Sequence, residues 1–80
     1  MDDNSILKKV SDLTDEEKSL EDSHLHEPLS KEKLERLHAI DVELDQLWDL
    51  LRRRRASRAA GINPDVEGVR PESVVENYEQ

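Results

Sequence analysis

A short basic segment stands out in an otherwise acidic chain of 80 residues. The stretch 45–58 reads DQLWDLLRRRRASR, and its second half carries five arginines in a protein whose formal net charge is −8. Guanidinium groups bind phosphates and carboxylates, so the segment could bind nucleic acid, a nucleotide phosphate or an acidic protein surface. It could also complement the negative end of a helix dipole, where cations are favoured. The arginines are Arg52, Arg53, Arg54, Arg55 and Arg58.

The number of these arginines exceeds what a helix end requires. Consecutive residues of a helix point roughly 100° apart, so the four adjacent arginines would surround the helix. Arg55 and Arg58 continue the apolar series that reaches Leu51, and they would lie beyond the reach of a shorter partner helix. The surplus cations predict a partner-binding role for the segment. The acidic residues that could instead neutralise some of the arginines are Asp2, Asp3, Asp65 and Glu67.

Trp48 is the single tryptophan of the chain and has two interpretations. It follows the apolar series of its helix and could therefore pack in a core. Tryptophan is also enriched among the residues that dominate binding energy at protein interfaces. We predict a partner-binding surface that combines this residue with the arginines and with two apolar residues of the C-terminal tail. Its members are Trp48, Arg52, Arg53, Arg55, Arg58, Val74 and Tyr78.

Binding of nucleic acid or of a nucleotide phosphate through the arginine segment 52–58 is the alternative function. Such binding rests on neutralising phosphates, and single-stranded nucleic acids also need aromatic side chains for base stacking. The segment has no interleaved aromatic residue, and its neighbours on both sides are acidic. We therefore favour an unidentified protein partner over nucleic acid.

Two histidines in the stretch EDSHLHE could bind a metal ion, because side chains two residues apart in an extended loop share a face. They are His24 and His26, with Asp22 and Glu27 as possible carboxylate ligands. No second cluster accompanies them, and no nucleophile–base pair or cofactor motif occurs. We therefore expect an ordinary polar loop, no bound metal or cofactor, and no enzymatic activity.

Acidic residues also interrupt or line the predicted helices. Asp41, Asp45 and Asp49 recur every four residues and form one stripe, which we expect to be a solvated face. Glu17 instead interrupts the apolar series of the first helix. It could extend its carboxylate from the apolar face to solvent, or it could pair with Arg36 or His38 across the hairpin and so help to fix the register of the helices.

Two amphipathic helices position these residues. Apolar residues at 6, 10, 13 and 20 recur at helical spacing and predict a helix over about residues 4–22. Ser30 is a candidate N-cap, and neither glycine nor proline follows until Gly61, which predicts a second helix over about residues 31–60. The fold predicted is an all-α, antiparallel two-helix hairpin, because the connector is short. In the expected register the numbers of opposite residues add to about 54.

The hairpin domain of residues 1–60 precedes a mostly extended tail of residues 61–80, which we do not expect to pack as an element. Pro71 could begin a short helix near residues 72–79. A two-helix hairpin buries little surface, so it could dimerise into a four-helix bundle or bind a larger partner. No apolar run approaches the ~20 residues of a membrane span. We therefore expect a cytoplasmic protein without membrane contact.

Several motifs together give a family resemblance that covers nearly the whole chain. They are the start MDD followed by IL, the DEE of residues 15–17, the LERL of 34–37, the LDQLWDLLRRRRA of 44–56 and the ending VRPESVVENYEQ. This set resembles a family of small actinobacterial proteins known as domain of unknown function 2630. The block from Trp48 to Arg55 and the ending VENYEQ are its most specific parts. The resemblance implies a cytoplasmic bacterial setting and supplies no activity.

The chain departs from this family pattern at two positions. Lys18 stands where the family usually has a histidine, and Leu47 stands where it often has a cysteine. Both departures argue against a metal or thiol role at these positions.

Overall fold

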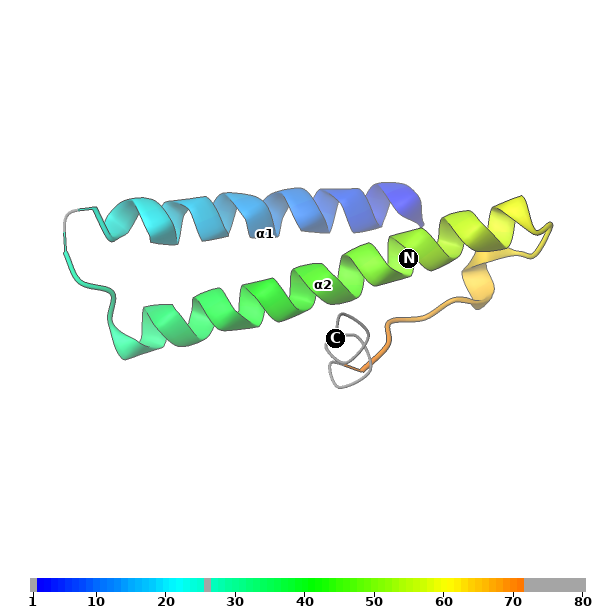
Figure 1. Cartoon of the computed structure of the whole chain (residues 1–80). Helices are drawn as coiled ribbons and strands as arrows, with labels where there is room; N and C mark the ends of the chain where they lie inside the picture. The colour runs from blue at the N-terminus through cyan, green and yellow to red at the C-terminus, as the bar shows by residue number, and fades with distance from the viewer. Residues whose placement is uncertain (1, 26, 72–80) are drawn as a thin grey trace.

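The computed structural model describes residues 2–25 and 27–71. It contains two long α-helices, α1 (Asp3–Ser23) and α2 (Lys31–Ala59), followed by a short 3-10 helix, η1 (Pro64–Val66). The two long helices lie side by side and antiparallel (Figure 1). No strand occurs among the described residues. The predicted all-α hairpin is confirmed, and both helices begin and end within one residue of their predicted bounds.

Helix α1 begins at a capping aspartate. A carboxylate oxygen of Asp2 accepts a hydrogen bond from the backbone N–H of Ser5 at 2.8 Å, which satisfies one of the free donors of the first turn. At the other end the Ser23 hydroxyl donates to the carbonyl of Leu20 at 2.7 Å. Pro28 follows in the connector, and a proline disfavours helical geometry at the residue before it, which is Glu27. The helix therefore ends before the connector.

Helix α2 ends in a Schellman motif at Gly61. The N–H of Ile62 donates to the carbonyl of Ser57 at 2.8 Å, and the N–H of Gly61 donates to the carbonyl of Arg58 at 3.1 Å. This closure needs a left-handed residue, and Gly61 supplies it with φ of 76° at no steric cost. The motif turns the chain back toward the body of α2.

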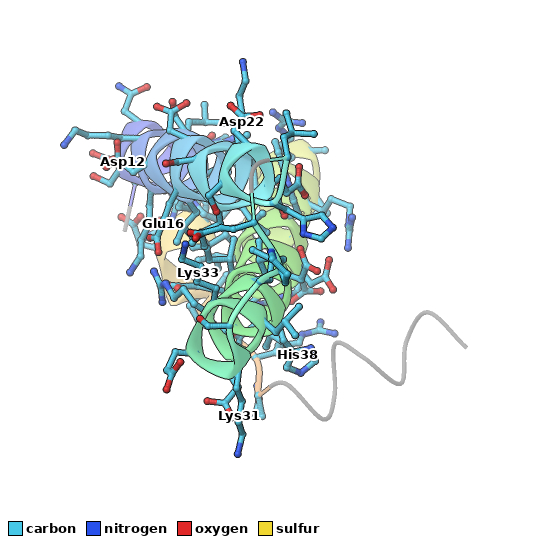
Figure 2. The ribbon with its side chains drawn as sticks, turned by 90° about the vertical axis from the view of Figure 1, so that its left-hand side faces the viewer. Asp12, Glu16, Asp22, Lys31, Lys33 and His38 are labelled. Carbon is cyan, nitrogen blue, oxygen red and sulfur yellow. The ribbon has the colours of Figure 1, made fainter. Side chains whose placement is uncertain are left out.

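The apolar core occupies the middle and the far end of the hairpin. Near the connector Leu20 is only partly buried, and Leu34 is 54% exposed. Figures 1 and 2 show that the two helices lie farther apart near the connector than at the far end. The predicted apolar series of α2 therefore packs only away from the connector. The core residues are Ile6, Val10 and Leu13 of α1 and Ile40, Leu47, Leu50 and Leu51 of α2.

Polar contacts hold the helices together near the connector. Arg36 binds the Glu16 carboxylate with two parallel hydrogen bonds, Nε to Oε2 at 2.5 Å and Nη2 to Oε1 at 2.7 Å. The Lys33 ammonium lies 3.5 Å from the Ser23 hydroxyl on α1. Figure 2 shows Glu16 and Lys33 at the junction of the two helices, whereas Asp22 points away from it. These exposed contacts are individually weak, so this end of the hairpin is the less strongly held.

The register of the hairpin agrees with the prediction to within one helical turn. Lys9 Nζ lies 3.1 Å from Glu43 Oε1, and the two residue numbers add to 52. Arg54 Nε lies 2.7 Å from Asp3 Oδ1, and these numbers add to 57. The expected value of about 54 falls between them.

The described part of the tail, residues 61–71, departs from the prediction because it is packed against α2. It runs back along the side of α2 that faces away from α1, in a mostly extended conformation (Figure 1). The Gln46 side chain donates to the carbonyl of Arg70 at 3.2 Å, and the arginine segment makes further bonds to the tail. Side-chain donors of α2 hydrogen-bond to backbone carbonyls of this segment. These bonds hold the segment on α2 although it has few apolar residues. The short helix predicted near residues 72–79 lies outside the described residues.

The core predicts a strong difference between two leucine substitutions. Leu51 is fully buried, so Leu51→Ala should lower the free energy of unfolding by about 2–5 kcal/mol, which a small domain can scarcely tolerate. Leu25 is 78% exposed, so Leu25→Ala should change it by less than about 0.5 kcal/mol. Urea denaturation followed by circular dichroism measures both. Equal effects of the two substitutions would contradict the described core.

Candidate interaction site on helix α2

The arginine segment divides into two sets that point in different directions. Arg53, Arg54 and Arg58 bind carboxylates of the same chain. Arg52 and Arg55 are exposed, and neither forms an ion pair within the described part of the chain. This division follows from helical geometry, since adjacent residues point roughly 100° apart and cannot all face the same neighbour.

Arg54 connects three segments of the molecule although only 4% of its surface is exposed. Its Nε donates to Asp3 Oδ1 at 2.7 Å at the start of α1. Its Nη1 donates to the Pro64 carbonyl at 3.2 Å and to Asp65 Oδ1 at 3.1 Å in η1. The hydrogen bond from Arg54 holds the pKa of Asp3 below its ordinary value, and the reciprocal bond raises the pKa of Arg54. A buried guanidinium needs such partners, because a buried unpaired charge is strongly destabilising.

Arg53 anchors the next part of the tail. Its Nε lies 3.0 Å from Asp49 Oδ2 on α2, and its Nη1 lies 2.7 Å from Glu67 Oε2. Its third nitrogen donates to the carbonyl of Gly68. The Ser57 hydroxyl donates to the other Glu67 oxygen at 2.9 Å, and these bonds, from Ser57 first and Arg53 second, lower the pKa of Glu67. The hydrogen-bonding capacity of Arg53 is therefore directed toward its own chain.

The structure corrects the predicted continuation of the apolar series. The buried positions beyond Leu51 are Arg54 and Ser57, whereas Arg55 is exposed. Arg58 does face α1, with Nη2 at 2.5 Å from Asp3 Oδ2. Arg54 can be buried because Asp3 and Asp65 neutralise it, and it was absent from the predicted site. The cluster of acids at both ends of the sequence was the signal that could have identified it.

Trp48, Arg52 and Arg55 form one outward stripe on α2. Their spacing of four and three residues places them on a single face of the helix. Trp48 is 41% exposed and does not belong to the buried core, so the core interpretation of this residue is wrong. The stripe combines a large aromatic surface with two cations that have no described carboxylate partner. Among residues 2–25 and 27–71, these three members of the predicted site are the ones that are exposed and not bound to a carboxylate of the chain.

A small cavity separates this stripe from the docked tail. Its volume is about 250 Å³, and its walls include Asp49, Arg52 and Arg53 of α2 and Arg70 of the tail. Asp49 is buried and is bound by Arg53, with Arg70 Nε at 3.8 Å from the same oxygen. The cavity is smaller than the ~300–1,000 Å³ of ordinary ligand pockets, so it suits one side chain of a partner rather than a cofactor.

Two predicted tail contacts, Val74 and Tyr78, lie outside the described residues, as does His26. His24 is exposed. Within residues 2–25 and 27–71, no group of three His, Cys, Asp or Glu side chains is arranged to hold a metal ion. No helix in this part of the chain is long and apolar enough to cross a membrane.

Glu17 makes a different contact from the predicted one. Its neighbour Glu16 takes Arg36, while Glu17 faces the Asp41 carboxyl on α2. The hydrogen bond with Asp41, together with partial burial, raises the pKa of Glu17 above its ordinary value. Two carboxylates that face each other repel unless they share a proton. Asp41 therefore belongs to a contact between the helices. The predicted solvated stripe is wrong at Asp49, which is buried and bound by Arg53.

Arg54 provides a test of the charged contacts that close the hairpin. Arg54→Lys keeps the charge but cannot donate to Asp3, Asp65 and Pro64 at once, since lysine lacks the planar fork. We expect this substitution to lower the melting temperature by several degrees. Arg55→Lys is the matched control and should leave the melting temperature unchanged. Thermal unfolding followed by circular dichroism measures both, and equal melting temperatures would exclude the proposed difference in role.

The opposite pKa shifts of Glu16 and Glu17 predict opposite effects on stability when each is replaced by glutamine. The pKa of Glu16 is lowered by Arg36, so this group stabilises the fold above its unfolded pKa, and the stabilisation is lost as the pH falls through the folded value. The pKa of Glu17 is raised, so its protonated form is favoured in the folded protein. The stability that this form contributes is lost as the pH rises through the pKa of the folded state.

At pH 7 we therefore expect Glu16→Gln to destabilise the protein and Glu17→Gln to stabilise it. The difference between the two variants should shrink as the pH falls, first through the raised pKa of Glu17 and finally through the lowered pKa of Glu16. Urea denaturation at several pH values measures the effect. A Glu17→Gln variant that is less stable than wild type at neutral pH would contradict the facing carboxylates.

Comparison with known proteins gives a family but no activity. A model of the family described as protein of unknown function (DUF2630) matches residues 2–80. The uncharacterized protein Rv0898c of Mycobacterium tuberculosis (strain H37Rv) is 44% identical over 77 residues, which is 95% of this chain and 88% of that protein. The uncharacterized protein Mb0922c of Mycobacterium bovis matches to the same extent. No solved structure matches. With a family model that spans almost every residue and relatives at this identity, the chain belongs to the DUF2630 family.

Proposed function

We propose that the protein acts without catalysis, in the cytoplasm, by binding another protein through the outward stripe of Trp48, Arg52 and Arg55. One observation carries this proposal. The chain neutralises three of its five clustered arginines internally, while two cations beside a half-exposed tryptophan are left without a described partner.

The composition of the stripe is that of a protein-binding surface. Tryptophan and arginine are the residue types most enriched among interface positions that dominate the binding energy. Exposed cations also accelerate and orient encounters with an acidic surface. The neighbouring cavity beside Arg52 can receive one partner side chain. A partner with an acidic and partly apolar contact surface fits this arrangement.

The alternative, binding of nucleic acid or a nucleotide phosphate through residues 52–58, is less well supported. Phosphate binding needs free guanidinium groups, and each phosphate contact contributes through the release of counterions. Arg53 and Arg54 already bind carboxylates at 2.7 Å, so two of the four adjacent arginines are engaged. An acidic chain that leaves so few cations free would repel a polyanion over most of its surface.

Capture from a native lysate with quantitative mass spectrometry tests the proposal. A protein retained by the wild type should be lost with Trp48→Ala and with the double variant Arg52→Ala and Arg55→Ala. Titration of the purified partner should show a Kd raised about 30-fold or more, as expected for positions that contribute at least ~2 kcal/mol. The matched controls are Leu25→Ala for the tryptophan and the double variant Lys8→Ala and Lys18→Ala for the arginines, since all three residues are exposed elsewhere.

The same experiment separates the alternative function. Lysate treated with nuclease should give the same captured protein if binding is direct. Retention of nucleic acid that survives ~200 mM salt, and that is lost with Arg52→Ala and Arg55→Ala, would favour the phosphate-binding function instead. Capture that is unaffected by all three stripe substitutions would refute a role for this face.

A further inference from the structure

Helix α2 has three sides, and the described chain covers two of them. Ile40, Leu47 and Leu51 lie in the core that α2 shares with α1. Gln46 and Arg53 hydrogen-bond to the tail on a second side. The third side carries residues spaced by seven, four, three, four and three, which is one continuous helical face. These residues are Leu34, Asp41, Asp45, Trp48, Arg52 and Arg55.

The charges on this third side are segregated about Trp48. Asp41 and Asp45 precede the tryptophan, and Arg52 and Arg55 follow it at nearly the same spacing. None of the four forms an ion pair within residues 2–25 and 27–71. The charged part of the face is about 21 Å long at the helical rise of 1.5 Å per residue. A face with acids at one end, cations at the other and an aromatic residue between is complementary to itself when it is reversed.

From this arrangement we infer that the partner of the third side is a second copy of the chain, with the two α2 helices antiparallel and a two-fold axis at Trp48. The inference rests on the proposed function and names its partner. Trp48 of each copy lies at the axis. Along this register, the numbers of two residues that lie opposite each other add to 96. Asp41 then lies opposite Arg55 of the other copy, and Asp45 lies opposite Arg52 within one residue. The two-fold axis repeats both pairs, which gives four ion pairs.

The same register also distinguishes the two possible directions of pairing. A parallel pair would place Asp45 against Asp45 and Arg52 against Arg52, which is repulsive. Symmetric dimers are built from such self-complementary patches.

The Glu17–Asp41 contact gives the dimer a further reason to form. The hydrogen bond with Asp41, followed by burial and the charge of Asp41, raises the pKa of Glu17. The guanidinium of Arg55 from the second copy would reach Asp41 and offset this repulsion. The interface thereby neutralises charge that each copy leaves unbalanced.

Two charge-reversal variants test the dimer. Asp41→Arg with Asp45→Arg makes the whole face basic, and Arg52→Asp with Arg55→Asp makes it acidic. Analytical ultracentrifugation of the full chain should show a dimer at micromolar concentration for wild type, and each variant should weaken self-association by about 100-fold or more. An equimolar mixture of the two variants should restore a dimer, because each basic face meets an acidic one.

Control variants carry the same changes of net charge on α1. They are Lys8→Asp with Lys18→Asp, and Asp12→Arg with Asp22→Arg, all at exposed positions. These should dimerise like wild type. Circular dichroism confirms that every variant is folded.

A cross-link provides a second measurement that keeps most charges in place. The chain contains no cysteine, so Asp45→Cys and Arg52→Cys each introduce a single thiol. A short bismaleimide should link a mixture of these two variants. It should link neither alone, because like positions are then offset by about seven residues, or ~10 Å along the axis.

Three outcomes would overturn the inference: a wild-type monomer at micromolar concentration, a dimer that survives both charge reversals, or two weakened variants that do not associate with each other. A monomer whose Trp48 becomes more accessible to iodide quenching after truncation at Pro71 would assign the face to the chain's own C-terminal segment. A monomer that still captures a foreign protein through Trp48 would overturn the dimer while leaving the proposed function intact.

Discussion

The buried guanidinium of Arg54 is the contact on which the arrangement of the chain depends. The apolar core is small, with seven buried apolar side chains among residues 2–25 and 27–71, and it cannot by itself fix three separate segments. Arg54 meets Asp3 at the start of α1 and the Pro64 carbonyl and Asp65 in η1, so one side chain positions both ends of the described structure on α2. Such a charge is tolerated inside a protein only when its partners are complete. The geometry of the hairpin's far end and the return of the tail are therefore coupled.

Local chemistry made the helices predictable, whereas the direction of single side chains was not. The capping side chain of Ser30 and the left-handed Gly61 are short-range signals, and the structure uses both as expected. Which of four adjacent arginines faces α1 depends on the rotation of α2, and an error of one residue turns a side chain by roughly 100°. The choice of Arg55 over Arg54 is such an error, and Glu17 over Glu16 is another. The packing of the tail was missed because its partners are hydrogen-bond donors of α2 and not apolar residues.

The two roles of the arginine segment follow from this geometry. A helix that packs against α1 on one side and against a polar tail on another leaves a third side open, and the segment supplies residues to all three. Arg54 is buried, and Arg53 binds the tail. Arg52 and Arg55 lie with Trp48 on the open side. Arginines that are adjacent in the sequence thus lie on three different sides of the helix, and the five arginines of the segment are distributed over these three sides.

The uneven packing between α1 and α2 has a consequence for how the chain reaches its fold. In most helical hairpins the residues beside the turn meet first, and their apolar contacts make the next contacts easier. Here the connector end offers mainly exposed polar contacts, while the buried ones lie far apart in the sequence, and Arg54 and Asp3 are separated by 51 residues. Closing such a long loop costs conformational entropy before those contacts can form. The contacts that hold this hairpin most strongly are therefore long-range ones, and contacts of this kind slow folding relative to local ones.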